Sequence, residues 1–342
     1  MKSLREDYYS KKFSHIYVEK AIKHHFRVQN ILQRFPEAHI VEINHYKDIF
    51  CRKGQKTGLQ HQAQALILAE KTGSLIYEGA AVCQSFGSEH FYYTSCVMNC
   101  IYDCEYCYLK GMYPSGHMVV FVNLEDVFRD VEKLLQKHEV YLCVSYDTDL
   151  LALEELTGFV KEWEIFAGKH EGLRMEIRTK CGRKDLWDSL CPNLRIIYAY
   201  TLSPDYVTRE YEHGTSALDM RIASAKTAIE KGFSVRLCFD PMLYCPDWKM
   251  EYREMLDYVF RQIKPEDLVD VSIGSFRISQ DYLKKMRKNV PLSPVVQFPY
   301  ENCRGVYQYP EVLRREMEKF LQGEIEKYMS KEKIFHWEEE SK

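Results

Sequence analysis

Two kinds of hydrophobic pattern alternate along the chain from about Leu75 onward. Short runs rich in apolar and β-branched residues lie between longer amphipathic stretches. A short apolar run indicates a buried strand, whereas apolar positions spaced three or four residues apart over a longer stretch indicate a helix. The predicted strands are 91–95, 117–123, 140–146, 173–179, 194–202, 233–242 and 268–276. The predicted helices are 124–138, 150–168, 217–232, 248–264 and 309–329.

This alternation predicts an α/β protein with a parallel sheet, open or curled into a barrel. Functional residues in such proteins gather in the loops at the carboxyl ends of the strands. The first part of the chain has a different hydrophobic pattern, with charged amphipathic stretches at 19–35 and 59–71. We therefore expect a helical N-terminal region over 1–75, a barrel over 76–330 and a disordered tail over 331–342.

Composition argues against a membrane protein and against a secreted, disulfide-rich protein. The chain has 342 residues, a formal net charge of −3 and 12 cysteines. It has no apolar run of about 18 residues that would span a membrane, and its first residues lack the apolar core of a signal peptide. We expect a cytoplasmic protein with reduced thiols. The cysteines are spread along the chain, which does not suit a disulfide scaffold.

The segment "CIYDCEYCYLKG" carries the most specific signal. Cys100, Cys104 and Cys107 follow the first barrel strand in a C-x3-C-x2-C spacing. A zinc site needs four ligands, usually in two pairs; no second pair exists, and the fourth ligand would have to be a residue such as His117. An odd number of thiols in a reducing compartment argues against a disulfide. An iron–sulfur cluster normally takes four thiolates, so three would leave one iron open for chemistry.

This motif, with an aromatic residue before its last cysteine, resembles the radical S-adenosylmethionine superfamily. The chain is also similar to the spore photoproduct lyase family, through segments that cover most of 90–320. The resemblance implies a partial (β/α)6 barrel and a 4Fe-4S cluster that binds S-adenosylmethionine and generates a 5′-deoxyadenosyl radical. It also implies repair of the spore photoproduct, 5-thyminyl-5,6-dihydrothymine, to two thymines. The matching segments are 106–109, 122–128, 179–180, 212–233 and 275–279.

The resemblance assigns roles to individual residues. It makes the three motif cysteines the cluster ligands, and it gives damaged DNA, an electron donor such as flavodoxin or ferredoxin, and the spore core as partners and location. The superfamily's Gly-Gly-Glu is absent here, as it is from spore photoproduct lyases. The other implied site residues are Tyr106 and Tyr108 in a radical relay, with Tyr106 also packing near the adenine; Thr148, Lys180 and Thr201 at S-adenosylmethionine; and Arg277 and Tyr307 at DNA. Arg304, a basic residue near Tyr307 in sequence, is a further candidate DNA contact.

The hydrogen donor is where the chain departs from the family. The family's donor cysteine aligns with Tyr146, and the nearest thiol along the predicted strand is Cys143. Alternation along a strand would turn these two side chains to opposite faces. Two other thiols precede the cluster, Cys83 and Cys96. We expect Cys83 to be the donor, then Cys143, with Tyr146 as a relay or donor itself.

Two other functions stay open at this stage. One is a different radical S-adenosylmethionine reaction on the same scaffold, which the net charge of −3 favours because non-specific DNA affinity depends on phosphate contacts. A local basic patch, such as the run "KKMRK" at 284–288, would still serve a flipped lesion. The other is a non-enzymatic zinc protein that binds nucleic acid.

Overall fold

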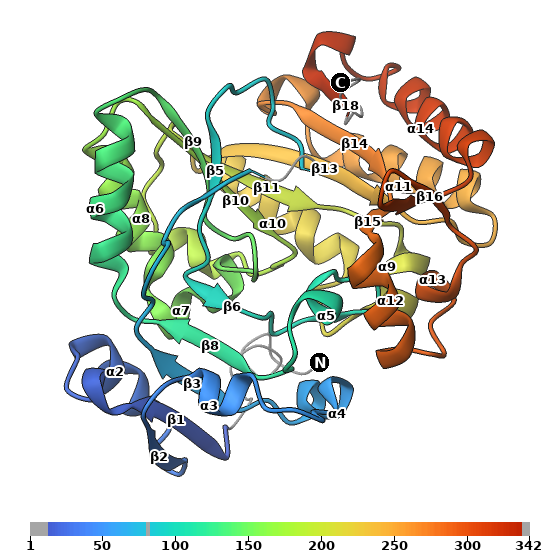
Figure 1. Cartoon of the computed structure of the whole chain (residues 1–342). Helices are drawn as coiled ribbons and strands as arrows, with labels where there is room; N and C mark the ends of the chain where they lie inside the picture. The colour runs from blue at the N-terminus through green and yellow to red at the C-terminus, as the bar shows by residue number, and fades with distance from the viewer. Residues whose placement is uncertain (1–12, 80–82, 337–342) are drawn as a thin grey trace.

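The computed structural model describes residues 13–79 and 83–336, and its centre is a curled sheet of eight strands (Figure 1). Every neighbouring pair in this sheet is parallel except the edge pair of β4 and β5. This arrangement confirms the predicted half-barrel. Its strands, in spatial order, are β18 (Ile334–His336), β14 (Val271–Ser275), β13 (Ser234–Met242), β11 (Ile196–Thr201), β10 (Leu173–Thr179), β9 (Val140–Cys143), β5 (Phe91–Tyr93) and β4 (Tyr77–Glu78).

Helices cover the convex face of the sheet. Tyr200 of β11, for example, shares a hydrogen bond of 2.7 Å with Ser224 of α10, and Tyr198 packs edge-to-face on Trp187 at 4.8 Å. The helix expected over 150–168 is broken at Gly158, whose φ is +69°, a conformation that glycine adopts without strain. The covering helices are α6 (Leu124–Leu135), α7 (Glu154–Thr157), α8 (Phe159–Gly168), α10 (Leu218–Glu230), α11 (Trp248–Gln262) and α14 (Glu311–Ile325).

The concave face is polar, although it is buried. Arg236 of β13 reaches across to Glu176 of β10 (2.5 Å) and to the hydroxyl of Tyr141 of β9 (2.7 Å), and it also pairs with Asp270. All four side chains are buried. Buried charges are tolerated when each is paired and hydrogen-bonded. The half-barrel therefore has an apolar outer layer and an interior in which these charged side chains are paired.

The N-terminal region is not the helical unit that was predicted. Its strands β1, β2 and β3 join β8 and β6, from later in the chain, in a second sheet with the order β2-β1-β3-β8-β6 (Figure 1). The stretch 59–71, expected to be a helix, divides into α4 (Thr57–Gln62) and strand β3 (Leu66–Ala69). The apolar run of β3 pairs in parallel with β8, which was expected in the barrel sheet. The other strands are β1 (His15–Glu19), β2 (His39–Ile43), β6 (Val97–Met98) and β8 (Met118–Phe121).

The predicted disordered tail is wrong for 331–336. Residues Lys331–Lys333 form a 3-10 turn and β18 pairs with β14, with Ile334 opposite Val271. The pairing satisfies the exposed edge of β14, which is the physical reason for order there. Residues 337–342 lie outside the described residues. None of the helices in the described part of the chain is long and apolar enough to span a bilayer.

The short elements around the mouth of the half-barrel complete the fold. Two of them, β16 and β17, form a hairpin that pairs with β15. On the N-terminal side, α2 and α3 pack beside the second sheet (Figure 1). The bounds are α2 (Phe26–Leu32), α3 (Lys47–Phe50), α5 (Leu109–Met112), α9 (Asp205–Tyr211), α12 (Gln280–Asn289), α13 (Pro294–Gln297), β7 (Asp103–Cys104), β12 (Glu212–His213), β15 (Arg277–Ser279), β16 (Glu301–Cys303) and β17 (Val306–Gln308).

Candidate active site

The cysteine loop is held at its centre and at its C-terminal end. At its centre, β7 pairs antiparallel with β12, and this register sets Cys104 opposite Glu212. After the last cysteine the chain enters α5, which packs on α12. A side chain at Gly111 would meet the backbone oxygen of Tyr282 at 2.4 Å, so only glycine permits this approach. The glycine that ends the motif therefore holds the loop against α12.

The three thiols lie near one another in a buried setting. Burial raises the pKa of Cys100 and of Cys104 to about 12 and that of Cys107 to about 11, and each thiol raises the pKa of at least one of the others. The sulfur of Cys100 accepts from the backbone N–H of Tyr102 at 3.5 Å. Thiolates at such positions need a cation beside them, which a metal cluster supplies. Within 13–79 and 83–336, no three His, Cys, Asp or Glu side chains are gathered around one metal position.

A buried ionic network lies beside Cys104. Its two main members, Glu212 and Arg221, were not among the predicted site residues. Glu212 accepts from Arg221 (2.5 Å), from Ser203 (3.0 Å) and from the hydroxyl of Tyr106. Burial favours the neutral acid, but the charges of Arg221 and Lys180 outweigh it and lower the pKa of Glu212 to about 2. The network therefore keeps a permanent carboxylate next to the cysteine loop. The signal was available, because both residues lie in the matched segment 212–233.

Lys180 connects this network to the predicted S-adenosylmethionine residues. Its Nζ lies 4.0 Å from a carboxylate oxygen of Glu212 and 5.4 Å from the ring centre of Tyr106. Its backbone N–H donates to Asp149 at 2.6 Å. Thr201, also predicted, accepts a hydrogen bond from Arg221 through its backbone oxygen at 3.1 Å. The structure thus brings Lys180 and Thr201 to the same network.

Thr148 is the third predicted contact, and its hydroxyl is unsatisfied. Its Oγ1 is buried and finds no hydrogen-bond partner among the described residues. An unpartnered buried hydroxyl costs free energy unless a ligand or water completes it. Asp149, next in sequence, also acts on the pKa of Cys100. A polar ligand between Thr148 and Lys180 would therefore adjoin the cysteine loop, which suits a group bearing an amine and a carboxylate.

The two tyrosines that were predicted to form a relay have different partners. The hydroxyl of Tyr106 donates to Glu212, as described above. The hydroxyl of Tyr108 instead donates to the backbone oxygen of Tyr146 at 2.5 Å and to Asp147 at 3.2 Å. Asp147 is buried, and burial raises its pKa. Of the two tyrosines, Tyr108 is the one connected to the predicted donor position.

Cys83 is the thiol that contacts Tyr146. Its sulfur lies 3.2 Å from the hydroxyl of Tyr146. Cys143 is buried at the end of β9 and is near enough to raise the pKa of Tyr146. Alternation does not separate these two, because the strand ends at Cys143 and Tyr146 follows in the next loop. Cys96 is buried elsewhere, beside the ammonium group of Lys71.

The predicted DNA contacts differ in how accessible they are. Arg277 makes a bidentate ion pair with Asp240 (2.9 and 3.0 Å), and its side chain is only 9% exposed. Arg304 is exposed at the turn of the β16–β17 hairpin with φ of +49°. Tyr307 is half-buried on β17, with the Arg287 guanidinium 5.5 Å from its ring centre. The lysines exposed on α12 are Lys284, Lys285 and Lys288.

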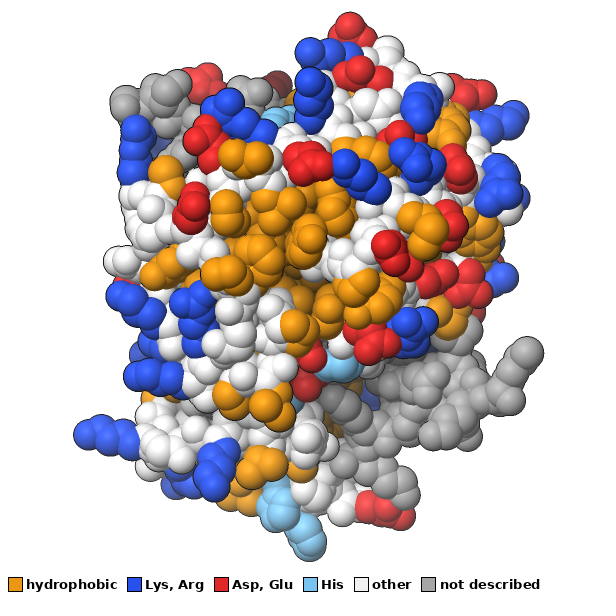
Figure 2. All heavy atoms as spheres, turned by 90° about the vertical axis from the view of Figure 1, so that its right-hand side faces the viewer, with side chains coloured by type: hydrophobic (Ala, Val, Ile, Leu, Met, Phe, Trp, Pro, Cys, Tyr) orange, Lys and Arg blue, Asp and Glu red, His pale blue; other side chains and the backbone are white. Residues whose placement is uncertain are grey.

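An apolar patch lies on the side of the molecule where β16 is drawn in Figure 1. Figure 2 shows this broad patch of hydrophobic side chains, with both signs of charge around it. Aromatic rings contribute to this side of the molecule, including Tyr244, which is 42% exposed and packs 6.0 Å from Phe298. The surface is suited to stacking contacts at least as well as to phosphate contacts.

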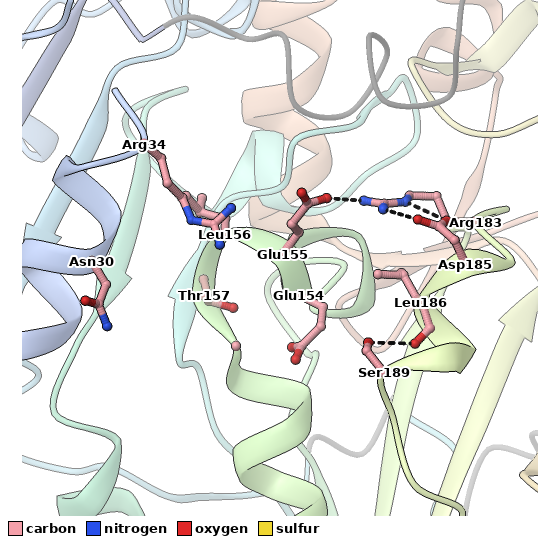
Figure 3. Close-up of a pocket in the computed structure, with 11 residues that line it drawn as sticks. Asn30, Arg34, Glu154, Glu155, Leu156, Thr157, Arg183, Asp185, Leu186 and Ser189 are labelled. Atoms are coloured by element: carbon pink, nitrogen blue, oxygen red, sulfur yellow. Dashed lines mark hydrogen bonds and ion pairs between the residues drawn. The ribbon is translucent and has the colours of Figure 1, made fainter. Parts of the chain in front are cut away.

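A separate pocket lies away from the cysteine loop. It has a volume of about 450 Å³ and is lined by residues of α2, α7 and the turn after β10 (Figure 3). Arg183 extends into this region between Glu155 (2.9 Å) and Asp185 (2.5 Å). None of the predicted site residues lines the pocket. The charged groups of this pocket pair with one another, and none of them belongs to the cysteine loop.

Comparison with known proteins completes the description. A family model described as spore photoproduct lyase matches residues 88–337. Spore photoproduct lyases of Clostridium acetobutylicum and of Geobacillus sp. strain Y412MC61 are 26% and 23% identical to the chain, over 70% and 67% of it and 74% and 71% of their own lengths.

Solved structures agree with this match in fold. A spore photoproduct lyase complexed with dinucleoside spore photoproduct superposes with a TM-score of 0.79 at 19% identity, covering 96% of this chain and 99% of that chain. A double mutant with bound AdoMet and dinucleoside spore photoproduct gives 0.79 at 20% identity, with 95% and 98% coverage. Since the family model covers well over half of the sequence, the chain belongs to the spore photoproduct lyase family.

Proposed function

We propose that this chain is a radical S-adenosylmethionine lyase that splits the spore photoproduct in DNA into two thymines. Family membership supports the reaction class, and the relatives solved with dinucleoside spore photoproduct support the substrate. The observation that carries the proposal is geometric. Lys180 lies beside Glu212 and Tyr106 at the cysteine loop, the hydroxyl of Thr148 is unsatisfied, and Tyr108 links the loop to the Cys83–Tyr146 pair.

The chain's own residues would hold the cofactors as follows. Cys100, Cys104 and Cys107 would bind three irons of a 4Fe-4S cluster. Lys180, with Thr148 and Thr201, would hold the methionine part of S-adenosylmethionine. When bound, these groups supply the 5′-deoxyadenosyl radical that takes a hydrogen from the adduct. An electron donor of the flavodoxin or ferredoxin type would reduce the cluster. The protein would act in the spore core.

The pair of Cys83 and Tyr146 would return the hydrogen. The thiol gives its hydrogen atom to the carbon radical left when the methylene bridge breaks, and a thiyl radical remains on Cys83. The Tyr146 hydroxyl, 3.2 Å away, then gives its hydrogen atom to that sulfur. One hydrogen moves in each step, so the thiol is restored and the radical passes to a phenol. Cys143 remains the second candidate for the donor.

The DNA side of the site would be formed by the β16–β17 hairpin. Arg304 at its turn is exposed and would contact phosphate, while Tyr307 would stack near the lesion. Arg277 has both terminal nitrogens engaged with Asp240, so we assign it to holding the wall of the site beside the lesion. A base or dinucleotide held by stacking and a few cations needs no strongly basic protein.

Product analysis tests the function. Anaerobically reconstituted protein, S-adenosylmethionine and a strong reductant are incubated with dinucleoside spore photoproduct, and thymine dinucleoside is measured. Its formation supports the proposal. Cleavage of S-adenosylmethionine without thymine formation would instead support a different substrate on the same scaffold. Metal analysis that finds zinc and no iron or sulfide would support the nucleic-acid-binding zinc protein.

A further inference from the structure

Four side chains form a continuous row from the proposed hydrogen donor toward solvent. The sulfur of Cys83 lies 3.2 Å from the hydroxyl of Tyr146. The ring of Tyr146 stacks on that of Tyr93 with 4.1 Å between centroids and 23° between planes. Tyr93 in turn stacks on Tyr77 at 5.2 Å and 24°.

The row is a consequence of strand pairing. Tyr93 ends β5 and Tyr77 begins β4, and the antiparallel register sets the two directly opposite each other. Tyr93 is also paired with Cys143 of β9, which brings it beside the loop that carries Tyr146. Neighbouring strands hold the rings, so their spacing is fixed by the sheet. Rings on opposed strand positions lie within contact distance.

Exposure increases along the row. Cys83, Tyr146 and Tyr93 are all partly buried, whereas Tyr77 is 37% exposed. The Tyr77 hydroxyl donates to the backbone oxygen of Ser74 at 2.7 Å. The outer end therefore meets water, and the inner end meets the thiol.

Packing alone does not account for the choice of residue. Phenylalanine would stack as well as tyrosine, since stacking depends on the ring. Yet all three positions in the row carry a hydroxyl, which makes each ring an oxidisable phenol. Tyr92, which directly precedes Tyr93 on β5, is not part of the row, and its hydroxyl is hydrogen-bonded to His138 at 3.3 Å. It offers a control on the same strand.

We propose that Tyr93 and Tyr77 extend the Cys83–Tyr146 pair into a path that carries a stranded radical from the site to the surface. This inference rests on the proposed function, because the radical on Cys83 is the product of the repair step. The path would clear a radical whenever the site fails to return it to the cofactor, and an external thiol would reduce it at Tyr77.

The transfer balances in electrons and protons. The Cys83 thiyl takes the hydrogen atom of the Tyr146 hydroxyl. The Tyr146 phenoxyl then takes an electron and a proton from Tyr93, and the Tyr93 phenoxyl takes an electron and a proton from Tyr77, so the radical reaches Tyr77 and both inner phenols are restored. The external thiol gives a hydrogen atom to the Tyr77 phenoxyl, and two resulting thiyls join as a disulfide. Each phenol stays neutral throughout, so the Lys71 ammonium 5.1 Å from the Tyr77 ring does not oppose the step.

Spin trapping on the working holoenzyme tests the path. The cluster is reduced and excess reductant is removed. S-adenosylmethionine, dinucleoside spore photoproduct and a nitrone spin trap are then added without external thiol. Peptide mass spectrometry locates the trapped radical, and thymine is measured in the same sample. We expect an adduct on Tyr77 in the parent protein, loss of that adduct in Tyr93→Phe, and an unchanged adduct in Tyr92→Phe.

The outcomes separate the two proposals. Thymine formation with an adduct on Tyr77 that depends on Tyr93 supports the path. Thymine formation with no adduct on Tyr77, or with the same adduct in Tyr93→Phe, overturns the path and leaves the repair function standing. Absence of thymine overturns both. Because Tyr93→Phe keeps the stacked ring, circular dichroism of the variant should match that of the parent.

Discussion

The two sides of the candidate site are built from different chemistry. Beside Cys104 stand permanent charges: Glu212, Arg221 and Lys180 form a buried ionic network. Cys83 instead contacts the phenol of Tyr146, whose ring stacks on that of Tyr93. The charged side can hold a zwitterion in place, whereas the phenol side can pass hydrogen atoms without moving charge into a buried space.

The difference follows from the cost of burying charge. A charge removed from water must be paired, and breaking such a pair is expensive. A phenol that loses or gains a hydrogen atom stays neutral and so avoids that cost. Burial raises the pKa of Tyr93 to about 12, which keeps this phenol protonated at neutral pH. We infer that cofactor binding and hydrogen return are separated by the type of residue as well as by position.

The largest effect is expected at the cluster ligands. Cys104→Ala should abolish the cluster and all cleavage of S-adenosylmethionine, because a three-thiolate site has no spare ligand. Iron, sulfide and 5′-deoxyadenosine are measured. The matched control is Cys245→Ala, another buried thiol that is not part of the motif. A Cys104→Ala protein that keeps its colour and its 5′-deoxyadenosine production would show that the loop is not the cluster site.

Breaking the charged side should destabilise the protein strongly. Glu212→Gln leaves Arg221 and Lys180 without their carboxylate, and loss of one partner of a buried pair costs about 3–5 kcal/mol. Urea unfolding measures the free energy. Glu316→Gln is the control, because Glu316 pairs with Lys249 at a half-exposed surface position and such pairs contribute about 0–1 kcal/mol. Equal losses in the two variants would contradict the network.

Lys180→Met should weaken S-adenosylmethionine binding while preserving the cluster. A hydrogen bond to a charged group contributes about 1.5–3 kcal/mol, which corresponds to roughly a tenfold to a hundredfold loss in affinity. Calorimetry on reconstituted protein gives the dissociation constant. Lys184→Met, four residues further on and exposed, should bind as the parent does. Unchanged affinity in Lys180→Met would remove this residue from the cofactor site.

The smallest effect concerns acid stability. Although burial alone would raise it, the charges of Arg178 and Arg236 lower the pKa of Glu176 below its ordinary value. A depressed carboxyl pKa adds stability that is full above the unfolded pKa and is lost as pH falls through the folded pKa. The advantage of the parent over Glu176→Gln, measured by urea unfolding, should therefore shrink as pH falls below about 4.5. A difference that stays constant down to acid pH would contradict this.

Strong local patterns made much of the fold predictable. The apolar runs of β10, β11 and β13 were located within two residues at each end. The N-terminal region was misassigned because the four-residue run of β3 directly follows a polar stretch and so resembles the end of an amphipathic helix. Its partner β8 is distant in sequence, and no local sequence pattern indicates which of the two sheets a strand joins.

The site was predictable where it depends on a motif and hidden where it depends on pairing. The cysteine spacing indicated the loop, and Cys83 was expected as donor. Its contact with Tyr146 could not be predicted from the sequence, because the two residues are far apart along the chain and only the fold brings them together. The Tyr93–Tyr77 stack likewise arises from the register of β4 and β5. Arg277 looks like a free DNA contact in sequence and is paired with Asp240 in the structure.

The central claim is that an exchangeable hydrogen on Cys83 completes the repair, and a solvent-isotope measurement tests it most directly. The reaction is run in deuterium oxide with dinucleoside spore photoproduct, and the thymine product is analysed by mass spectrometry. We predict deuterium in the methyl group formed from the methylene bridge, and abnormal adducts with little deuterated thymine in Cys83→Ala, while Cys143→Ala behaves as the parent. Thymine without deuterium in the parent protein, or unchanged deuterated thymine in Cys83→Ala, would contradict the account.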